Sequence, residues 1–549
     1  MTLEILAKPA VKARAHAAIN APQPRGPLAR NAAYERASVE RSGLALRNAG
    51  TASFPVVQTR RAAQAPATEP ERLPGRISLI VVAGILRGFD AAVAFSAGFA
   101  ATAFTPAGGA DASAPLPLAI SLFGALLVVN ILHLLGSYHT RVVRSFSLSA
   151  THLLLAWGAA ALAAGGVILL SHVPAGPERT WLASWLGYGA ILSLLSRAVC
   201  ALLMIRWRRQ GRLQRRIAVL GSGAIGQRLL RRINAQADRN VVVVGVYDDR
   251  LARLPERCMG HKVLGTVADL IDRVRHGGID MVIVALPLSA ERRIAEIMAQ
   301  LRQAAVDICL CPDQYGFQLS SNGLARGGDE TWHVAGVNLL CAEQRPLRDW
   351  RGIAKNIEDR VVAAIILMLI SPILAVIAVL VKLDSPGPVF FRQKRYGLNN
   401  QLIEVLKFRT MHNHASDPKA EQLTQRNDPR VTRLGAFLRR TSLDELPQFI
   451  NVLRGEMSVV GPRPHALAAK AGGLLYQEAV RYYDARHRMK PGITGWAQVN
   501  GWRGETETVE QIEKRVEYDL YYIRNWSIWL DFLIIFRTIF GGFTGRQAY

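Results

Sequence analysis

The sequence predicts a multi-domain membrane protein with a four-helix transmembrane bundle, a Rossmann-like α/β domain and a mostly α-helical C-terminal domain. Three observations lead to this fold class. Half of the residues are hydrophobic while a fifth are charged, which indicates membrane segments joined to water-exposed domains. Four apolar stretches follow one another between residues 77 and 205, and a strand, a glycine-rich loop and a helix come after them.

The charge balance narrows the class of partner. The net charge is +25, from 67 Lys and Arg against 42 Asp and Glu. Such an excess suits nucleic acid, an anionic membrane surface or phosphorylated ligands. The five cysteines contain no C-x-x-C pair, so we expect neither a zinc site nor a disulfide framework, and the water-exposed parts are predicted to lie in a reducing compartment.

The first 75 residues are rich in Ala, Arg and Pro and show no hydrophobic periodicity. We interpret residues 1–75 as a disordered basic tail on the cytoplasmic side. The opening MTLEILAKPAVKAR lacks the apolar run and small-residue cleavage site of a secretory signal, so the mature chain is expected to keep it.

Residues 76–206 are predicted to form the four transmembrane helices, because each apolar block is long enough to cross ~30 Å of hydrocarbon. A single block would also suit a buried core helix, but four in succession favour membrane spans. The segment RWRRQGRLQRR after the fourth block holds six arginines, whereas the loops after the first and third blocks together hold only Arg179. The positive-inside rule therefore places both ends of the bundle in the cytoplasm. The blocks are 77–104, 116–136, 150–171 and 180–205.

The first block carries two charged residues, Arg87 and Asp90. Residues three apart on a helix are close enough to neutralise each other. We therefore expect a structural ion pair between them, with a role in binding lipid head groups as the alternative.

A Rossmann-like α/β domain is predicted over residues 212–340. RIAVLGSGAIGQRLL reads as a strand, then Gly221-x-Gly223-x-x-Gly226, then a helix, and the next strand ends in an Asp-Asp pair. This pattern is typical of a dinucleotide site with its pyrophosphate on the helix N-terminus. Alternatively, the glycines only permit a tight turn and close packing, and the domain is regulatory or a scaffold. No Tyr-x-x-x-Lys supports epimerase or dehydratase chemistry.

A fifth apolar block, 361–381, opens the C-terminal domain predicted over 350–549. Both of its flanks are basic, and Ser371-Pro372 stands at its middle. Proline removes a backbone hydrogen bond and bends a helix. We predict a re-entrant membrane helix that enters and leaves by the cytoplasmic face, broken at Ser371 and Pro372. A proline-kinked spanning helix is the alternative.

The segment SLDELP contains two adjacent acids, Asp444 and Glu445. Ser442-x-x-Glu445 has the spacing of a capping box, so Glu445 could simply cap a helix. Pro447 belongs in a first helical turn, so we expect a helix to start near the pair. Carboxylates at that positive end stay ionised, which suits a nucleophile or a metal ligand.

Basic residues surround the acid pair in the sequence. Together they could clamp a diphosphate, and carboxylates, a divalent metal and arginines are the recurring components of phosphoryl-transfer sites. We expect no nucleic-acid partner, because no nucleic-acid motif is present and four helices are predicted to span a membrane. The basic residues are Lys407, Arg409, Arg439, Arg440 and Arg463.

Several stretches around these residues resemble the bacterial sugar transferases, the monotopic phosphoglycosyl transferases. They are SPGPVFFRQKRYG, LKFRTM, RVTRLGAFLRRTSLDELPQFINVLRGEMSVVGPRP, KPGITGWAQVNG and YDLYYIRNWS. The layout of four membrane helices, an α/β domain and a C-terminal domain is similar to that of the large polyprenyl-phosphate hexose-1-phosphate transferases. The motifs WRGETET and QAY resemble the branch that primes colanic-acid-type exopolysaccharides with glucose.

The resemblance implies that Asp444 attacks a UDP-sugar, releases UMP and carries the phosphosugar until undecaprenyl phosphate displaces it. It implies that Glu445 binds Mg²⁺, and that the enzyme lies in the bacterial inner membrane among membrane lipids, with its other domains cytoplasmic. A homodimer is one option for its assembly. The implied substrate-binding residues are Lys407, Arg439, Arg463 and Asp519.

Three alternatives remain open at this point. The sugar could be galactose instead of glucose, since no residue is tied to a sugar hydroxyl. The protein could be a membrane-anchored oxidoreductase that binds a dinucleotide at the Gly221 loop. It could also be a non-enzymatic regulator of polysaccharide assembly, in which the acid pair only caps a helix.

Overall fold

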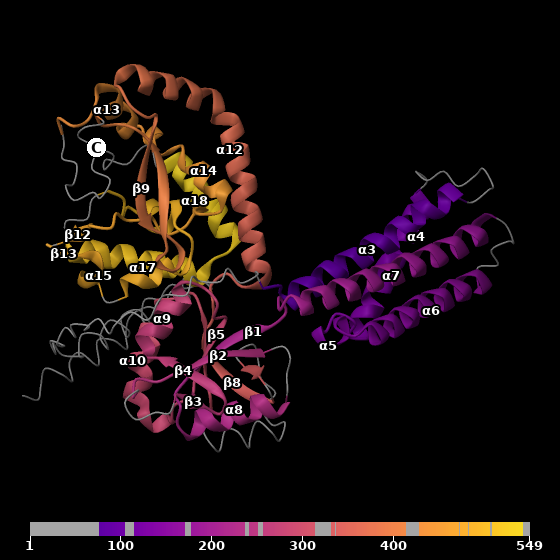
Figure 1. The fold of residues 1–549 in the computed structure, drawn as a ribbon. Helices are drawn as coiled ribbons and strands as arrows, with labels where there is room; N and C mark the ends of the chain where they lie inside the picture. Colours follow the sequence, from indigo (N-terminus) through magenta and orange to yellow (C-terminus); the bar gives the residue numbers. More distant parts are fainter. Residues whose placement is uncertain are drawn as a thin grey trace, which may run out of the picture. The chain divides into compact units, whose positions relative to one another are not determined.

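A computed structural model describes residues 76–541, apart from a set of short segments (Figure 1). The predicted tail, residues 1–75, and the terminal QAY therefore lie outside the described residues. The segments left out are 105–114, 171–176, 237–240, 251–255, 313–330, 335, 413–427, 472, 481 and 505–507.

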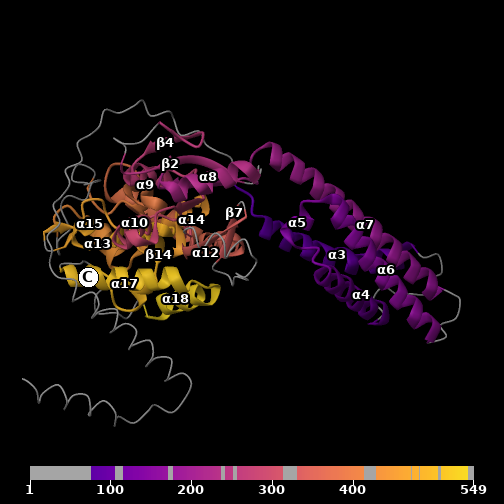
Figure 2. The same ribbon diagram turned by 90° about the horizontal axis from the view of Figure 1, so that it is seen from below.

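Long helices form the N-terminal bundle, as both ribbon views show (Figure 1, Figure 2). Within the bundle, α3, α6 and α7 are long and apolar enough to cross a membrane, whereas the apolar part of α4, Ser121–Leu134, is shorter. Among the other described residues, the helix Asp349–Asp384 is also long and apolar enough. A short helix, α5, lies between α4 and α6. The bounds are α3 Leu79–Phe104, α4 Pro115–Leu134, α5 Thr140–Val143, α6 Phe146–Leu170 and α7 Pro177–Arg209.

Small residues and tryptophans fill the bundle core. The Trp185 indole donates to the carbonyl of Ala94 at 2.8 Å, and a Cβ added to Gly124 would lie 2.2 Å from the Trp185 ring. Glycine is therefore needed at this position for the helices to approach.

The charged residues of the bundle pair differently from the prediction. The Asp90 carboxylate accepts from the Arg197 guanidinium of α7 at 2.7 Å and from the Tyr138 hydroxyl at 2.9 Å. Arg87 instead places its guanidinium 6.0 Å from the centroid of the Tyr138 ring. The predicted Arg87–Asp90 pair is wrong, because packing of α7 against α3 brings a cation to Asp90 from another helix.

The α/β domain is a three-layer structure around an eight-stranded sheet of order β3-β4-β2-β1-β5-β6-β8-β7. The strands β4, β2, β1, β5 and β6 are parallel, while β3, β7 and β8 pair antiparallel. The strands are β1 Arg215–Leu220, β2 Val241–Tyr247, β3 Arg257–Cys258, β4 His261–Gly265, β5 Met281–Val284, β6 Asp307–Leu310, β7 Thr331–Val334 and β8 Val337–Glu343.

Helices cover both faces of this sheet (Figure 1). Leu229 and Leu230 of α8 pack in one buried cluster, and Leu270 of α9 and Leu301 of α10 pack in a second. Both faces of the central strands are thus buried, as a parallel sheet requires. The helices are α8 Ala224–Gln236, α9 Val267–Arg275 and α10 Glu291–Leu301.

The C-terminal domain begins with α12, Asp349–Asp384, which Figure 1 shows as a bent helix. The helix is not interrupted at the predicted break, since helical structure continues through Ser371 and Pro372. Ser371 Oγ donates to the carbonyl of Met368 at 2.9 Å, which compensates in part for the missing N–H of the proline.

The rest of the C-terminal domain combines a two-stranded hairpin with short helices and two longer ones. The hairpin strands β9 and β10 are antiparallel, and β11 pairs in parallel with β14. The elements that matter for the site are β9 Phe390–Tyr396, β10 Leu402–Phe408, α13 Arg433–Arg440, η5 Leu443–Glu445, α14 Gln448–Arg454, β11 Ser458–Val460, η6 Tyr483–Arg488, β14 Gly492–Thr494, α17 Val509–Asn525 and α18 Ile528–Gly541.

Candidate active site

The acid pair lies in a single 3₁₀ turn, η5, between α13 and α14. Ser442, just before it, has φ 58°, the left-handed conformation that non-glycine residues rarely adopt. The predicted capping box is wrong, because Ser442 makes no side-chain cap and its Oγ accepts instead from Arg503 Nη2 at 2.8 Å. The next helix starts at Gln448, close to the pair as predicted.

Two cations hold the Glu445 carboxylate. Arg463 donates to both oxygens, at 2.6 Å and 3.1 Å, and Lys407 Nζ lies 2.8 Å from Oε1. Burial alone would raise the pKa of Glu445, but Arg463 and Lys407 outweigh it and hold that pKa well below its usual range. The Glu445 carboxylate is therefore ionised, and Arg463 and Lys407 neutralise its negative charge.

Asp444 is the freer of the two acids. Its side chain is 11% exposed, and its nearest ion-pair contact with a described residue is Lys407 Nζ at 3.9 Å from Oδ2. Burial raises the pKa of Asp444, and Lys407 opposes that shift, while the charge of Glu445 adds to it. Adjacent residues thus carry unlike carboxylates, one clamped and one buried without close ion pairing.

The structure brings Lys407, Arg439 and Arg463 together around the pair from three different elements. Lys407 is on β10, Arg439 is in the last turn of α13, and Arg463 follows β11. All three charges act on the pKa of Asp444 in the lowering direction. This cation ring has the composition expected for binding a phosphorylated ligand.

Two other predicted cations lie elsewhere. Arg409 is buried and donates to the carbonyls of Val381 and Ser385 at 3.1 Å and 2.5 Å. It therefore stabilises the end of α12 and not a ligand. Arg440 is exposed at the end of α13.

Asp519 is buried beneath the site. Its carboxylate lies 2.7 Å from Nη2 of Arg486, a side chain with no exposed area. The same Nη2 donates to the backbone carbonyl of Arg463 at 2.6 Å. Asp519 thus orients the arginine that holds the Arg463 backbone, and its connection with the cation ring is indirect.

His465 completes this buried support. Burial together with Arg486 and Arg515 lowers the pKa of His465 well below its ordinary value. The neutral ring lies next to Arg486, with 2.5 Å between Nη1 and Nδ1. A neutral imidazole can accept from the guanidinium without adding a second positive charge to the buried cluster.

Arg395 is a site residue that sequence reasoning missed. It bonds to the Pro464 carbonyl and to Gln393 Oε1, and burial followed by the charge of Arg463 lowers its pKa to about 10. A signal was present in the alternation of the hairpin: Arg395 pairs with Ile403, four positions along each strand from the Lys407–Phe391 pair. Alternation therefore puts Arg395 on the face of the hairpin that carries Lys407.

The acids fit a divalent cation only together with a ligand. Among the described residues, no cluster of three or more His, Cys, Asp or Glu side chains could hold a metal. Mg²⁺, however, usually binds proteins through one or two carboxylates and takes its other ligands from substrate phosphates and water. Asp444 and Glu445 match that donor set.

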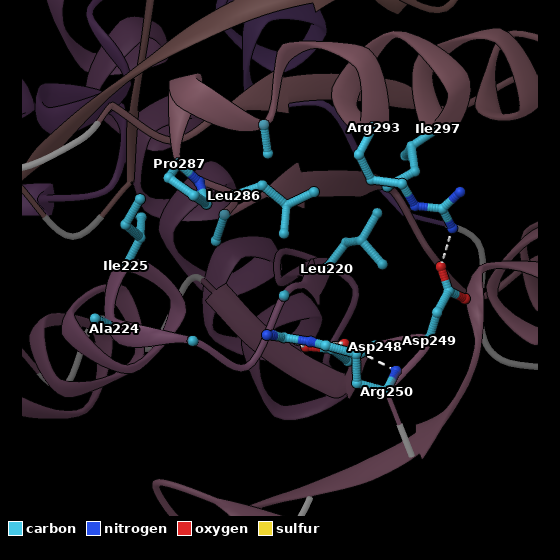
Figure 3. Close-up of a pocket in the computed structure, with 14 residues that line it drawn as sticks. Leu220, Ala224, Ile225, Asp248, Asp249, Arg250, Leu286, Pro287, Arg293 and Ile297 are labelled. Carbon is cyan, nitrogen blue, oxygen red and sulfur yellow. Dashed lines mark hydrogen bonds and ion pairs between the residues drawn. The ribbon is translucent and has the colours of Figure 1, made fainter. Parts of the chain in front are cut away.

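The three glycines of the Gly221-x-Gly223-x-x-Gly226 motif do not all have the same role. Gly221 and Gly223 line a pocket at the end of β1 (Figure 3), whereas Gly226 does not. A Cβ on Gly226 would lie 2.0 Å from the carbonyl oxygen of Gly221, so this glycine permits close packing of α8.

A bent apolar helix joined to an acid pair within a cation ring defines a membrane enzyme of the phosphoryl-transfer class. Residues 350–545 match the bacterial sugar transferase family, and residues 133–312 match a family described as CoA-binding domain. The chain belongs to the bacterial sugar transferase family.

Three named relatives each match between 62% and 72% of this chain. The chain is 41% identical over 398 residues to UDP-glucose:undecaprenyl-phosphate glucose-1-phosphate transferase of Escherichia coli, covering 72% of this chain and 82% of the relative. It is 44% identical to the protein of the same name from Klebsiella pneumoniae, over 62% of this chain and 71% of the relative. It is 40% identical to undecaprenyl-phosphate glucose phosphotransferase of Komagataeibacter xylinus, over 66% of each chain.

Proposed function

We propose that this protein transfers glucose-1-phosphate from UDP-glucose to undecaprenyl phosphate and releases UMP, the first membrane step of exopolysaccharide synthesis. The named relatives act on these substrates and are similar over most of this chain. The observation that carries the proposal is the unequal acid pair: two cations neutralise Glu445, whereas Asp444 has no close ion pair with any residue that the structure describes.

The unequal pair supports a covalent route. An Asp444 oxygen attacks the phosphorus that bears the sugar, the bond to the UMP oxygen breaks, and UMP leaves with that electron pair. The product is a phosphosugar ester of Asp444. An oxygen of undecaprenyl phosphate then attacks the same phosphorus, and the Asp444 carboxylate leaves. One site thereby serves an aqueous donor and a lipid acceptor in turn.

The cations that contact Glu445 are also the groups that would bind the diphosphate of the donor. Lys407 and Arg463 both contact Glu445, so without substrate the carboxylate neutralises the cations that a diphosphate would need. When the diphosphate arrives, Lys407 and Arg463 turn to its oxygens, since bidentate arginine–phosphate pairing is strong. The Glu445 carboxylate is then released.

The released Glu445 would hold Mg²⁺ together with the diphosphate of the donor. Bound there, the ion would neutralise charge on the phosphates. In this scheme Glu445 orients the donor and Asp444 stays free to attack, which separates the roles of the two neighbouring acids.

Glu445→Gln is expected to raise the Mg²⁺ concentration for half-maximal UMP release by about tenfold or more, because one charged ligand is lost. The measurement is UMP release against Mg²⁺ concentration. Glu404→Gln, an exposed acid on β10, is the control and should behave as wild type. An unchanged Mg²⁺ dependence in Glu445→Gln would exclude Glu445 as a ligand.

The pH profile tests Asp444 as the attacking group. Attack needs the carboxylate, and the pKa of Asp444 is raised by burial, so kcat/KM should fall as the pH drops through an apparent pKa above the ordinary value for aspartate. Lys407 lowers this pKa, so Lys407→Met should move the acid limb to higher pH.

The matched control is Lys394→Met, because Lys394 is exposed on the other face of the same hairpin. Its acid limb should coincide with that of wild type. A limb that does not move in Lys407→Met would show that Asp444 is not the group whose ionisation limits the rate.

We also propose that α12 is re-entrant and that the soluble domains face the cytoplasm of a bacterial inner membrane. Ala363 packs in the cluster of Val405, and Val381 packs in the cluster of Phe408. Val405 and Phe408 belong to one strand, β10. Both ends of the apolar segment thus pack on one domain, which a spanning helix would place on opposite sides of the membrane.

Cysteine labelling tests the course of α12. Ile357→Cys and Leu383→Cys stand at exposed positions on the two flanks, and both should react with an impermeant maleimide only when the cytoplasmic face is open. The background variant has the native cysteines replaced by serine. Labelling of one flank from the periplasm would support a spanning helix instead.

Isotope exchange tests the function and the covalent route together. Purified protein should exchange labelled UMP into UDP-glucose without undecaprenyl phosphate, because the first half-reaction is reversible. Transfer to lipid without any such exchange would leave the overall reaction in place and exclude the covalent route. Neither exchange nor transfer with UDP-glucose, but both with UDP-galactose, would change the assigned sugar.

A further inference from the structure

Four of the five cysteines belong to one apolar cluster of the α/β domain, and two of them face each other. Cys309 on β6 and Cys341 on β8 are directly opposite in the antiparallel β6–β8 pair. Opposite residues of such a pair have Cα atoms about 4.5–5.5 Å apart, and a disulfide requires about 4.4–6.8 Å. The strand register therefore places the two thiols where a bond between them needs no movement of the backbone.

The two side chains also point to the same face of the sheet. Successive residues of a strand alternate between its faces. Cys309 and Cys341 both pack in the cluster that includes Leu339. The neighbours of Cys309 on β6, Ile308 and Leu310, pack in the cluster on the other face. Both sulfurs are thus on one side of the sheet, as a bridge between neighbouring strands requires.

The two thiols differ in burial and in acidity. Cys309 has no exposed area, whereas Cys341 is partly exposed. A hydrogen bond between the two thiols lowers the pKa of Cys341 and raises that of Cys309. Burial and Asp307 oppose the shift at Cys341, and the charges of Arg348 and Arg215 add to it. Cys341 is therefore the thiol that ionises more readily and that a small oxidant can reach.

The other two cysteines of the cluster lack these features. Burial raises the pKa of Cys311 to about 12, and it also raises the pKa of Cys258. Both are buried, and a buried cysteine of this kind packs as a small apolar side chain. Cys341 differs from them in its exposure, in its lowered pKa and in the thiol that faces it.

We propose that Cys309 and Cys341 are a modification site at which a hydroperoxide forms a reversible disulfide. The Cys341 thiolate attacks one peroxide oxygen and the O–O bond breaks. The other oxygen takes a proton and leaves as an alcohol, or as water when the oxidant is hydrogen peroxide, and Cys341 becomes a sulfenic acid. The Cys309 sulfur then attacks the Cys341 sulfur, the S–O bond breaks, and water leaves with the thiol proton. Two thiols are oxidised and one peroxide is reduced.

The disulfide would fasten β8 to the rest of the sheet. In the sheet β8 lies between β6 and β7, and β7 is at the edge. A covalent link restricts the unfolded chain and so stabilises the folded one. Disulfides in proteins of a reducing compartment are usually transient and redox-sensing, so we expect the bond to form under peroxide and to be lost on reduction. The site is independent of the acid pair and of the transfer reaction.

The test is peroxide treatment of the full-length protein in detergent, followed by alkylation of the remaining thiols, trypsin digestion and mass spectrometry. Cys309 and Cys341 fall on different tryptic peptides, 303–326 and 327–348. We expect these peptides to be linked, with a mass about 2 Da below their sum because two hydrogens are lost. Fragmentation distinguishes Cys309 from Cys311 on the first peptide. The unfolding midpoint should rise on oxidation and return with dithiothreitol.

Two variants separate the thiol that reacts from the thiol that resolves. Cys309→Ala should stop at the sulfenic acid, which dimedone traps on Cys341, whereas Cys341→Ser should give neither the link nor the dimedone adduct. Cys200→Ser, on α7, is the control and should be oxidised as wild type is. In the wild-type protein, Cys341 should lose its reactivity toward alkylation at least about tenfold faster than Cys200. Circular dichroism confirms the folding of each variant.

The proposal is overturned if peroxide gives no link between the two peptides, or if the link persists in Cys341→Ser. A link through Cys311 would overturn the assignment to Cys309. An unchanged unfolding midpoint in the oxidised protein would overturn the stabilising effect on the sheet. Mapping of the link in wild-type protein decides the first point even if a variant fails to fold.

Discussion

Asp444→Asn is expected to reduce UMP release from UDP-glucose by about 10⁴-fold or more, the scale seen when a covalent nucleophile is removed. The amide nearly preserves the shape of the side chain but cannot attack phosphorus. Among the described residues the Asp444 side chain makes no ion-pair contact shorter than 3.9 Å, so the substitution should leave the Glu445 contacts and the fold in place. Release of UMP from membranes or purified protein is the measurement.

The loss should extend to labelled-UMP exchange and to the mass of a trapped phosphosugar adduct on the protein. Glu404 is an exposed acid on β10. The Glu404→Gln variant should therefore keep UMP release, labelled-UMP exchange and the trapped adduct at wild-type levels. Native turnover in Asp444→Asn would exclude the covalent route through this residue. It would also favour the readings in which the acid pair is only structural.

Asp519→Asn is expected to lower the free energy of unfolding by about 3–5 kcal/mol, because it leaves the charge of Arg486 buried without its acid. Both side chains are almost completely inaccessible, at 0% and 2% exposure. The shift of the unfolding midpoint in detergent measures the effect. Glu517→Gln, on the same helix with a half-exposed side chain paired to Lys514, should change it little.

A kinetic readout separates positioning from simple stabilisation. Arg486 holds the backbone carbonyl of Arg463, so loosening Arg486 should raise the KM for UDP-glucose more than it lowers kcat, at a temperature well below the unfolding midpoint. Equal KM values in Asp519→Asn and wild type would show that Asp519 only stabilises the fold. A large loss of kcat at unchanged KM would indicate contact with the reacting groups.

The sequence alone determined the features that depend on neighbours along one element. Apolar blocks of bilayer length predicted the long helices of the bundle. The succession of a strand, a glycine-rich loop and a helix predicted the parallel sheet and its Gly221 loop. The pattern of acids, prolines and arginines around Asp444 predicted a site for phosphorylated ligands near a helix start. Periods of two and 3.6 residues and the bilayer thickness are local constraints, so they can be read directly from the chain.

Only the tertiary structure decided which charges meet. It pairs Asp90 with Arg197 instead of Arg87, places Arg409 on the end of α12, and buries Asp519 against Arg486. It also gives both neighbouring cations to Glu445 and so leaves Asp444 as the freer acid. Partners from different elements depend on how those elements pack, and sequence spacing carries no information about the distance between them.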